Sequence, residues 1–261
     1  MRLLTFLSDF GRGSPYPAAM KAAAAARCDA FLLDISHDVP PGGIREGAYL
    51  LWSVVAACAP GTVHCAVIDP GVGTARAALA IVSGGQVFVG PDNGVLLPAA
   101  RRLGSPAVYR LNDAGVWRQP VSATFHGRDV FAPAAAHLVS GTAVAAVGVL
   151  ADSFVDLTFS PGRRDGATLI GEILWIDRFG NLVTSIPGDL LGGMLRGSGV
   201  IVETPSAGLP AAIARTFADV QPGQAAVLVG SDGVVEVAVN RGSAASRLAA
   251  VAGMGLKVRP A

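Results

Sequence analysis

The stretch VIDPGVGTAR, residues 67–76, places an acidic and a basic side chain on either side of a glycine-rich turn. Asp69 follows an apolar run typical of a buried strand, and Arg76 comes where the turn ends. Glycines permit the positive φ angles that direct main-chain N–H groups toward an anion or a lone pair. The pattern favours a site in which a guanidinium orients a carboxylate, although a turn with a surface ion pair would have the same residues.

Three other short motifs carry polar side chains. SDFG (8–11) ends the first apolar run with Asp9, and a carboxylate at the end of a strand can accept the hydroxyls of a ribose or simply form a turn. TFHGRD (124–129) places His126 before a glycine at the start of a helical pattern, and PDNG (91–94) contains Asn93 within a turn signal. Each motif alone has an ordinary structural interpretation.

The elements that must position these motifs alternate between strand and helix in the first part of the chain. Apolar runs typical of strands are followed by helix-like segments, several of which end at glycine. The expected strands are 3–10, 30–36, 61–69, 77–85 and 86–94, with the last two paired around a glycine turn, and the expected helices are 15–28, 42–59, 94–104 and 127–141. This alternation predicts βαβ units and a mostly parallel sheet with helices on both faces.

Four polar residues follow the ends of these expected strands: Asp9, Ser36, Asp69 and Asn93. In sheets of this kind, ligands bind outside the carboxyl ends of the parallel strands. We therefore expect the four side chains to lie along one edge of the sheet.

The pattern changes near residue 166, after which short strand-like runs dominate. They are 171–177, 181–187, 199–204, 225–240 and 255–260, and the long run 225–240 contains a Ser-Asp-Gly turn typical of a hairpin. We predict an α/β domain at 1–155, a linker at 156–166 and a small all-β barrel of about five to seven strands at 167–261.

Composition limits the classes of function. The 261 residues have a formal net charge of +1 and no basic run, so nucleic acid is not an expected partner. No window of ~18 residues is continuously apolar, and the N-terminal segment lacks the apolar core of a signal peptide, so we expect a cytoplasmic protein without a membrane span.

The cysteines at 28, 58 and 65 match no zinc or redox spacing and are expected to be buried structural thiols. Structural roles are also expected for the histidines at 37, 64 and 137.

The motifs taken together and in order resemble one enzyme family. SDFG with PYPAAMK, ISHDVPPGGIREGAYLL, VIDPGVGTAR, VGPDNGVL, TFHGRDVFAP, WIDRFGNLVTSIP and VNRGSAA are similar to the S-adenosylmethionine hydroxide adenosyltransferases, relatives of fluorinase and chlorinase. The resemblance extends from residue 3 to about residue 247. It implies an N-terminal α/β domain, a C-terminal β-barrel, and a homotrimer whose sites lie where one subunit's N-terminal domain meets its neighbour's C-terminal domain. The implied reaction is attack of water at C5′ of S-adenosyl-L-methionine, which gives adenosine and L-methionine without a cofactor or metal.

The resemblance also implies roles for individual residues. Asp69, Arg76 and His126 would form the polar catalytic set that holds the attacking water. The implied substrate-binding residues are Asp9 for the ribose hydroxyls, Asn93 at the sheet edge, Asp177 for the methionine ammonium, Phe179 and Asn181 for the nucleoside, and Ser231 for the methionine carboxylate. Two positions depart from the relatives, since Ser14 stands where an acid is usual and Asp232 stands where fluorinase has an arginine.

Two other functions fit parts of the pattern. Five residues, Asp9, Asp69, Asp92, His126 and Asp129, could ligate a divalent metal in a phosphoesterase-like hydrolase, although they form no Asp-x-Asp or His-x-His pair. A non-catalytic adenosine-nucleoside binding protein could keep the pocket alone. The set Asp69, Arg76 and His126 argues against this second alternative, because a binding protein has no use for water-orienting groups beside C5′.

Overall fold

A computed structural model describes residues 2–193 and 198–261 of the chain. The chain forms two compact units, Met1–Thr158 and Phe159–Ala261. Across the described residues, no helix is long and apolar enough to cross a membrane. The two units are described separately below.

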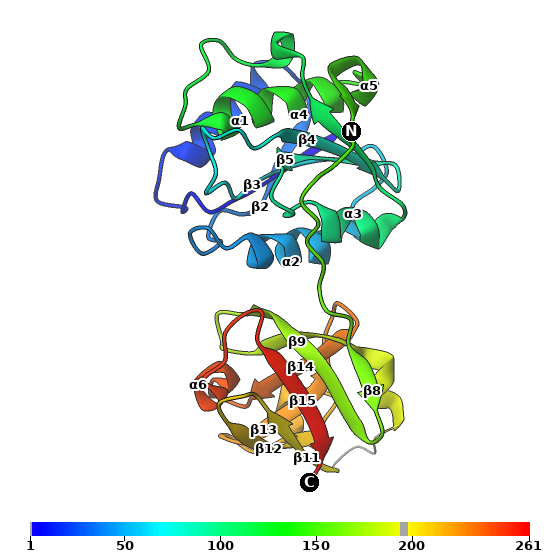
Figure 1. Ribbon diagram of the computed structural model, residues 1–261. Coiled ribbons are helices and arrows are strands. Elements are labelled where there is room, and N and C mark those ends of the chain that lie inside the picture. The colour runs from blue at the N-terminus through cyan, green and yellow to red at the C-terminus, as the bar shows by residue number, and fades with distance from the viewer. Residues whose placement is uncertain (1, 194–197) are drawn as a thin grey trace. The chain divides into compact units, whose positions relative to one another are not determined.

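The first unit is built on a seven-stranded sheet (Figure 1). Its strands are β1 (Leu3–Ser8), β2 (Phe31–Ser36), β3 (Val63–Val67), β4 (Ala78–Ser83), β5 (Gln86–Pro91), β6 (Ala107–Leu111) and β7 (Gly148–Leu150), in the spatial order β2-β1-β3-β5-β4-β6-β7. Strands β2, β1, β3 and β5 are parallel, whereas β4, β6 and β7 pair antiparallel. β4 and β5 are joined by two glycines, a connection too short for a parallel crossover. The expected α/β fold with its glycine-turn strand pair is confirmed.

Helices cover both faces of this sheet (Figure 1). The helices are α1 (Tyr16–Ala25), α2 (Ile44–Val55), α3 (Leu97–Leu103), α4 (Ala132–Val139) and α5 (Val144–Val147), with a short 3₁₀ turn η1 (Ala114–Val116) and a π-helical turn η2 (Gly127–Phe131). Figure 1 shows α1 and α4 on one face and α2 and α3 on the other. The central strand β3 is buried at every position, which explains its continuous apolar sequence.

The cysteines correct one expectation. Cys65 on β3 is buried, and burial raises the pKa of its thiol. Cys28 and Cys58 are only partly buried, because they follow the ends of α1 and α2, where the chain returns to the surface. The expected buried structural thiol therefore applies to Cys65 alone.

The second unit is a β-barrel. Its strands are β8 (Arg163–Asp165), β9 (Thr168–Ile176), β10 (Leu182–Pro187), β11 (Gly199–Glu203), β12 (Gly208–Ile213), β13 (Ala225–Val229), β14 (Val234–Val239) and β15 (Gly255–Pro260), accompanied by the 3₁₀ turns η3 (Gly188–Gly193) and η4 (Phe217–Asp219) and the helix α6 (Ala244–Leu248). The spatial order is β10-β14-β13-β12-β11-β15-β9-β8, and a further pairing of β10 with β9 closes seven of the strands into a ring. The expected barrel is confirmed.

The segment 156–166, expected as a linker, has contacts along its length. Asp156 forms an ion pair with Arg101 in the first unit, the main-chain N–H of Ser160 donates to Glu172 in the second, and residues 163–165 form β8. The change from one compact unit to the other falls between Thr158 and Phe159.

Candidate active site

The loop between β3 and β4 brings Asp69 and Arg76 together. Arg76 donates from Nε to Asp69 Oδ1 at 2.9 Å and from Nη2 to Asp69 Oδ2, a bidentate pair. The carboxylate and guanidinium side chains are only 5% and 12% exposed. Because both side chains are buried, Asp69 and Arg76 do not form the surface ion pair that the sequence pattern also allows.

Glycine is required in this loop at one position. Gly73 has a φ of +78°, and a Cβ there would lie 2.6 Å from the carbonyl oxygen of Ala123. The loop can therefore approach the 118–126 segment closely only without a side chain at this position. That approach brings the loop next to the segment that carries His126.

His126 completes a cluster of three side chains. The same Nη2 of Arg76 lies 2.8 Å from His126 Nδ1, although the two residues are separated by 50 positions in sequence. A guanidinium can only donate, so Nδ1 must accept, and the neutral imidazole then carries its proton on Nε2. Burial and, after it, the charge of Arg76 lower the pKa of His126 below the ordinary value of 6.5. The ring is thus held neutral near pH 7, with an N–H group on its free side.

Asp129 anchors the segment that carries His126. Its buried carboxylate accepts hydrogen bonds from Arg128 Nε at 2.7 Å, Arg118 Nη1 at 3.1 Å and the Ser122 main-chain N–H at 2.9 Å. Burial alone would raise the pKa of Asp129, but the hydrogen bonds from Arg128, Ser122 and Arg118 outweigh it and lower the pKa to about 2. The chain directly after His126 forms the π-helical turn η2, a local widening often found at functional sites.

The polar residues expected at one sheet edge do follow the ends of four parallel strands. Asp9 follows β1, Ser36 ends β2, Asp69 comes two residues after β3 and Asn93 two residues after β5. Asp9 Oδ2 accepts the Gly42 main-chain N–H at 2.8 Å. The Asn93 amide donates to Ile68 O at 2.7 Å and accepts from the Val95 N–H at 3.2 Å, so it holds the residue that precedes Asp69.

Three aromatic rings near these loops were not identified from the sequence. Phe10, Tyr16 and Phe125 meet edge to face, with ring centroids 5.2–6.0 Å apart. Phe10 is next to Asp9 and Phe125 is next to His126 in sequence, so the aromatic cluster joins the two loops. Position beside a polar motif was the one signal that could have revealed them.

In the second unit, Asp177 organises the turn that carries Phe179 and Asn181. Asp177 Oδ1 accepts the main-chain N–H groups of Phe179 at 2.8 Å and Asn181 at 2.9 Å, and its Oδ2 accepts the Asn181 side-chain amide at 2.9 Å. Gly180, with a φ of +81°, lies so close to Ser243 that a Cβ would meet its Oγ at 2.1 Å. The turn leaves Phe179 71% exposed while Asn181 is buried.

This turn lines a hollow of about 480 Å³. Its walls are formed by aromatic, aliphatic and polar residues of the β9–β10 turn, of η4 and of the segment from β14 to α6: Phe179, Asn181, Phe217, Val239, Asn240, Arg241 and Gly242. An exposed aromatic face beside a buried amide and main-chain groups suits a flat heteroaromatic ring.

The turn between β13 and β14 carries Ser231, which is exposed, and Asp232. Glu236 on β14 has a raised pKa because it is partly buried and faces the negative charges of Asp177 and Asp232. The position of Asp232 therefore adds negative charge to a region that already contains two carboxylates.

Ser14, the other position that departs from the relatives, lies in the first unit. It donates its hydroxyl to Phe10 O at 2.7 Å and so closes the SDFG loop.

Comparison with known proteins agrees with the resemblance drawn from the motifs. Residues 4–148 match the SAM hydroxide adenosyltransferase N-terminal domain and residues 171–257 match the C-terminal domain of the same family. The chain is 41% identical to an (R)-S-adenosyl-L-methionine hydrolase of Salinispora arenicola, over 98% of this chain and 97% of the relative, and 26% identical to a fluorinase of Actinopolyspora mzabensis, over 98% and 96%. A crystal structure of an uncharacterized conserved protein from Thermotoga maritima, 34% identical, superimposes with a TM-score of 0.92 over 98% of this chain and 99% of that one. Both domains of the chain are thus accounted for, and the protein belongs to the SAM hydroxide adenosyltransferase family.

Proposed function

We propose that the protein hydrolyses S-adenosyl-L-methionine to adenosine and L-methionine, and that Asp69, Arg76 and His126 hold the attacking water. The observation that carries the proposal is the contact of these three side chains: Arg76 bonds both oxygens of Asp69 and, through the same Nη2, Nδ1 of His126. The family relationship over the whole chain supports the reaction.

The leaving group of this reaction needs no acid from the protein, because it departs as a neutral thioether. The water oxygen forms a bond to C5′ as the C5′–S bond breaks, and the bonding electron pair returns to the sulfonium sulfur, which leaves as the neutral thioether of methionine. One proton is released from the water. The protein must therefore position the nucleophile, receive its proton and exclude bulk water, and positioning alone can contribute several kcal/mol.

The hydrogen-bond directions support a division of these tasks among the three residues. Because Nδ1 of His126 accepts from Arg76, its Nε2–H is left to donate to the water oxygen. Arg76 uses one lone pair on each oxygen of Asp69, and a second lone pair on each oxygen is left for the water proton. We assign proton acceptance to Asp69, with His126 orienting the oxygen and Arg76 fixing both groups.

The substrate-binding roles rest on the same relationship. Asp9 is proposed to accept the ribose hydroxyls, Phe179 and Asn181 to bind the adenine, and Asp177 and Ser231 to contact the methionyl group, with Asn93 supporting the Asp69 loop. These residues divide between the units, Asp9 and Asn93 in residues 1–158 and the other four in residues 159–261. We propose that a homotrimer completes each site, one subunit supplying the first set and its neighbour the second, in a head-to-tail contact that closes into a ring.

The configuration at sulfur is a finer part of the proposal. Two relatives of 41% and 40% identity over nearly the whole chain, from Salinispora arenicola and Thermus thermophilus, are named (R)-S-adenosyl-L-methionine hydrolases. We propose that this protein also acts on the (R) sulfonium epimer. Separate assays of the (R) and (S) epimers test this point, and equal turnover of both would contradict it.

Two of the five candidate ligands of the metal-dependent alternative are already held in ion pairs. Asp69 is bound by Arg76, and Asp129 is buried and bound by Arg118 and Arg128. A carboxylate already paired with guanidinium groups is a poor ligand for a divalent cation, because it would have to give up its partner.

Incubation of the protein with S-adenosyl-L-methionine in ¹⁸O-labelled water, with and without excess EDTA, tests the function. We expect adenosine labelled at the 5′ oxygen, unlabelled methionine, and rates unaffected by EDTA. A nucleoside product without the label at its 5′ oxygen would contradict attack at C5′. Loss of turnover on chelation that one metal restores would favour the phosphoesterase-like alternative.

A further inference from the structure

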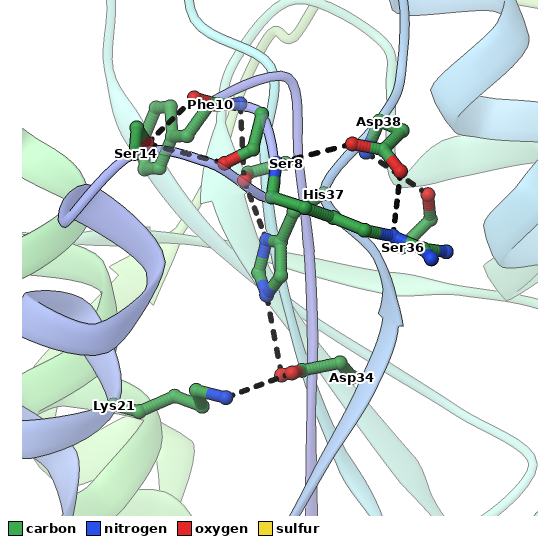
Figure 2. A network of polar contacts seen from close by, with 10 residues as sticks. Ser8, Phe10, Ser14, Lys21, Asp34, Ser36, His37 and Asp38 are labelled. Atoms are coloured by element: carbon green, nitrogen blue, oxygen red, sulfur yellow. Dashed lines mark hydrogen bonds and ion pairs between the residues drawn. The ribbon is translucent and has the colours of Figure 1, made fainter.

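A chain of polar contacts lies beneath the loop that carries Asp9 (Figure 2). Ser8 Oγ lies 2.7 Å from His37 Nδ1, His37 Nε2 lies 3.2 Å from Asp34 Oδ1, and Lys21 Nζ donates to Asp34 Oδ2 at 2.7 Å. These residues come from β1, the end of β2 and α1, and the proposed function uses none of them.

The contacts combine the residue types of a hydrolytic Ser–His–Asp triad, but the network cannot act as one. The Ser8 side chain is fully buried and His37 is 5% exposed. Asp34 is shared with Lys21, which together with His37 lowers the pKa of Asp34 although its partial burial acts in the opposite direction. A substrate cannot reach Ser8 Oγ, so the network must serve the protein itself.

The contacts have one consistent direction. Asp34 Oδ1 lies within ion-pair distance of His37 Nε2 but outside hydrogen-bond geometry, and its negative charge favours the tautomer with the proton on Nε2. Nδ1 then accepts the Ser8 hydroxyl proton, and the Ser8 oxygen is left to accept the Phe10 main-chain N–H at 3.3 Å. The residues on both sides of Asp9 are therefore fixed through one imidazole ring.

The same segment also holds the far side of the Asp9 loop. The His37 carbonyl accepts the Gly11 N–H at 2.7 Å, Asp38 Oδ1 accepts the Arg12 N–H at 3.1 Å, and the Gly42 N–H donates to Asp9 Oδ2 at 2.8 Å. Figure 2 shows His37 between Ser8 on one side and Asp34 on the other. Asp9 is thus one residue from a His37 contact toward the N-terminus and two residues from another toward the C-terminus.

We infer that His37 is a positioning residue for ribose recognition: without touching the nucleoside, its imidazole fixes the direction of the Asp9 carboxylate through Ser8, while its main-chain carbonyl holds Gly11. The inference rests on the proposed role of Asp9. A carboxylate that accepts two vicinal hydroxyls needs a fixed direction, because both hydrogen bonds depend on its orientation. The imidazole supplies that direction from inside the sheet.

The test measures how well the protein distinguishes a ribose with hydroxyls from one without. Affinities for adenosine and 2′,3′-dideoxyadenosine are measured by calorimetry for the wild type, Asp9→Ala, His37→Asn and His37→Gln. Asparagine can keep an acceptor near the position of Nδ1, whereas glutamine can keep a donor near Nε2 and loses the Ser8 contact. His137→Gln, a partly buried histidine on α4, is the matched control.

We expect the wild type to favour adenosine by about tenfold or more, as is typical for hydrogen bonds to a charged group. Asp9→Ala and His37→Gln should lose most of this preference, while His37→Asn and His137→Gln should keep it. A merely structural role for His37 would weaken both ligands equally and leave the ratio unchanged. If His37→Gln does not fold, Ser8→Ala removes the same contact and is expected to lose the preference as well.

The possible results distinguish a wrong role for His37 from a wrong role for Asp9. If the wild type prefers adenosine and Asp9→Ala abolishes that preference, but His37→Gln and Ser8→Ala keep it, the positioning role is wrong and the Asp9 role stands. If the wild type binds both nucleosides equally, the Asp9 role fails and the inference fails with it.

Discussion

Two acidic residues of the proposed site show opposite ways of holding a carboxylate. Asp177 in the barrel binds main-chain and side-chain groups of its own five-residue turn, whereas Asp69 in the α/β unit is bound by Arg76, which in turn contacts His126 from a distant segment. The first arrangement is encoded locally and forms with the turn. The second depends on how separate loops meet, so it must be held from outside, by Gly73 and by Asp129.

The comparison predicts the largest effects at the Asp69 cluster. Asp69→Asn keeps the shape but loses the negative charge, and Arg76→Ala removes the clamp, so both should lower kcat by ~10²-fold or more while substrate affinity changes little. Single-turnover rates measured beside calorimetric affinities check this. If both variants keep wild-type rates, the pair only stabilises the turn and the catalytic assignment is wrong.

A smaller effect, on stability and rate together, is expected at the external support. Asp129→Asn leaves the donor groups of three residues, Arg118, Ser122 and Arg128, without their carboxylate. The free energy of unfolding should therefore fall by about 1–3 kcal/mol, and kcat should fall as the His126 segment loosens. The matched control is Asp156→Asn, which breaks an exposed Arg101 pair and should cost less than about 1 kcal/mol. Equal losses in the two variants would remove the distinction between the buried and the exposed pair.

The pH dependence of Asp129 has a definite sign. Its folded-state pKa of about 2 is below the ordinary value of 3.8, so its contribution to stability is complete above about pH 4 and is lost as the pH falls toward 2. The difference in unfolding free energy between wild type and Asp129→Asn should therefore shrink over that window. Denaturant titrations at pH 5, 4 and 3 measure it.

The pH dependence of activity tests the neutral state of His126. Protonation would turn Nδ1 from an acceptor into a donor facing Arg76, which breaks the cluster. Because the pKa of His126 is lowered by burial and by Arg76, kcat/KM should remain level through pH 6.5 and fall only at lower pH. His126→Asn, which keeps an acceptor but does not titrate, should lack this component of the acid limb. If kcat/KM of His126→Asn falls at low pH with the same midpoint as the wild type, the fall is caused by another group.

The difference between the two carboxylates also explains what could be predicted from the sequence. The sequence predicts Asp9, Asp69 and Asn93 on one edge because parallel strands end on the same side, and the short spacing of Asp69 and Arg76 makes their contact foreseeable. The support of His126 by Asp129 could not be predicted from residue patterns, because it depends on a π-helical turn and on the folding of the preceding loop, which brings Arg118 and Ser122 to the carboxylate. Similarly, the sequence predicts only a structural role for His37, because its partners Ser8 and Asp34 come from different strands and no local pattern joins them.

The smallest effect is expected at the locally encoded turn. Phe179 is 71% exposed, so Phe179→Leu should change the free energy of unfolding by no more than about 0.5 kcal/mol. If the ring stacks on adenine in the assembled enzyme, KM for S-adenosyl-L-methionine should rise by about tenfold with kcat nearly unchanged, because stacking stabilises substrate and transition state alike. Val251→Ala, another exposed apolar residue of the same unit, is the control and should leave KM unaltered. A fall in kcat at constant KM would show that Phe179 contributes to the chemical step. The contrast between a locally encoded binding turn and a catalytic cluster built from distant segments would then be wrong.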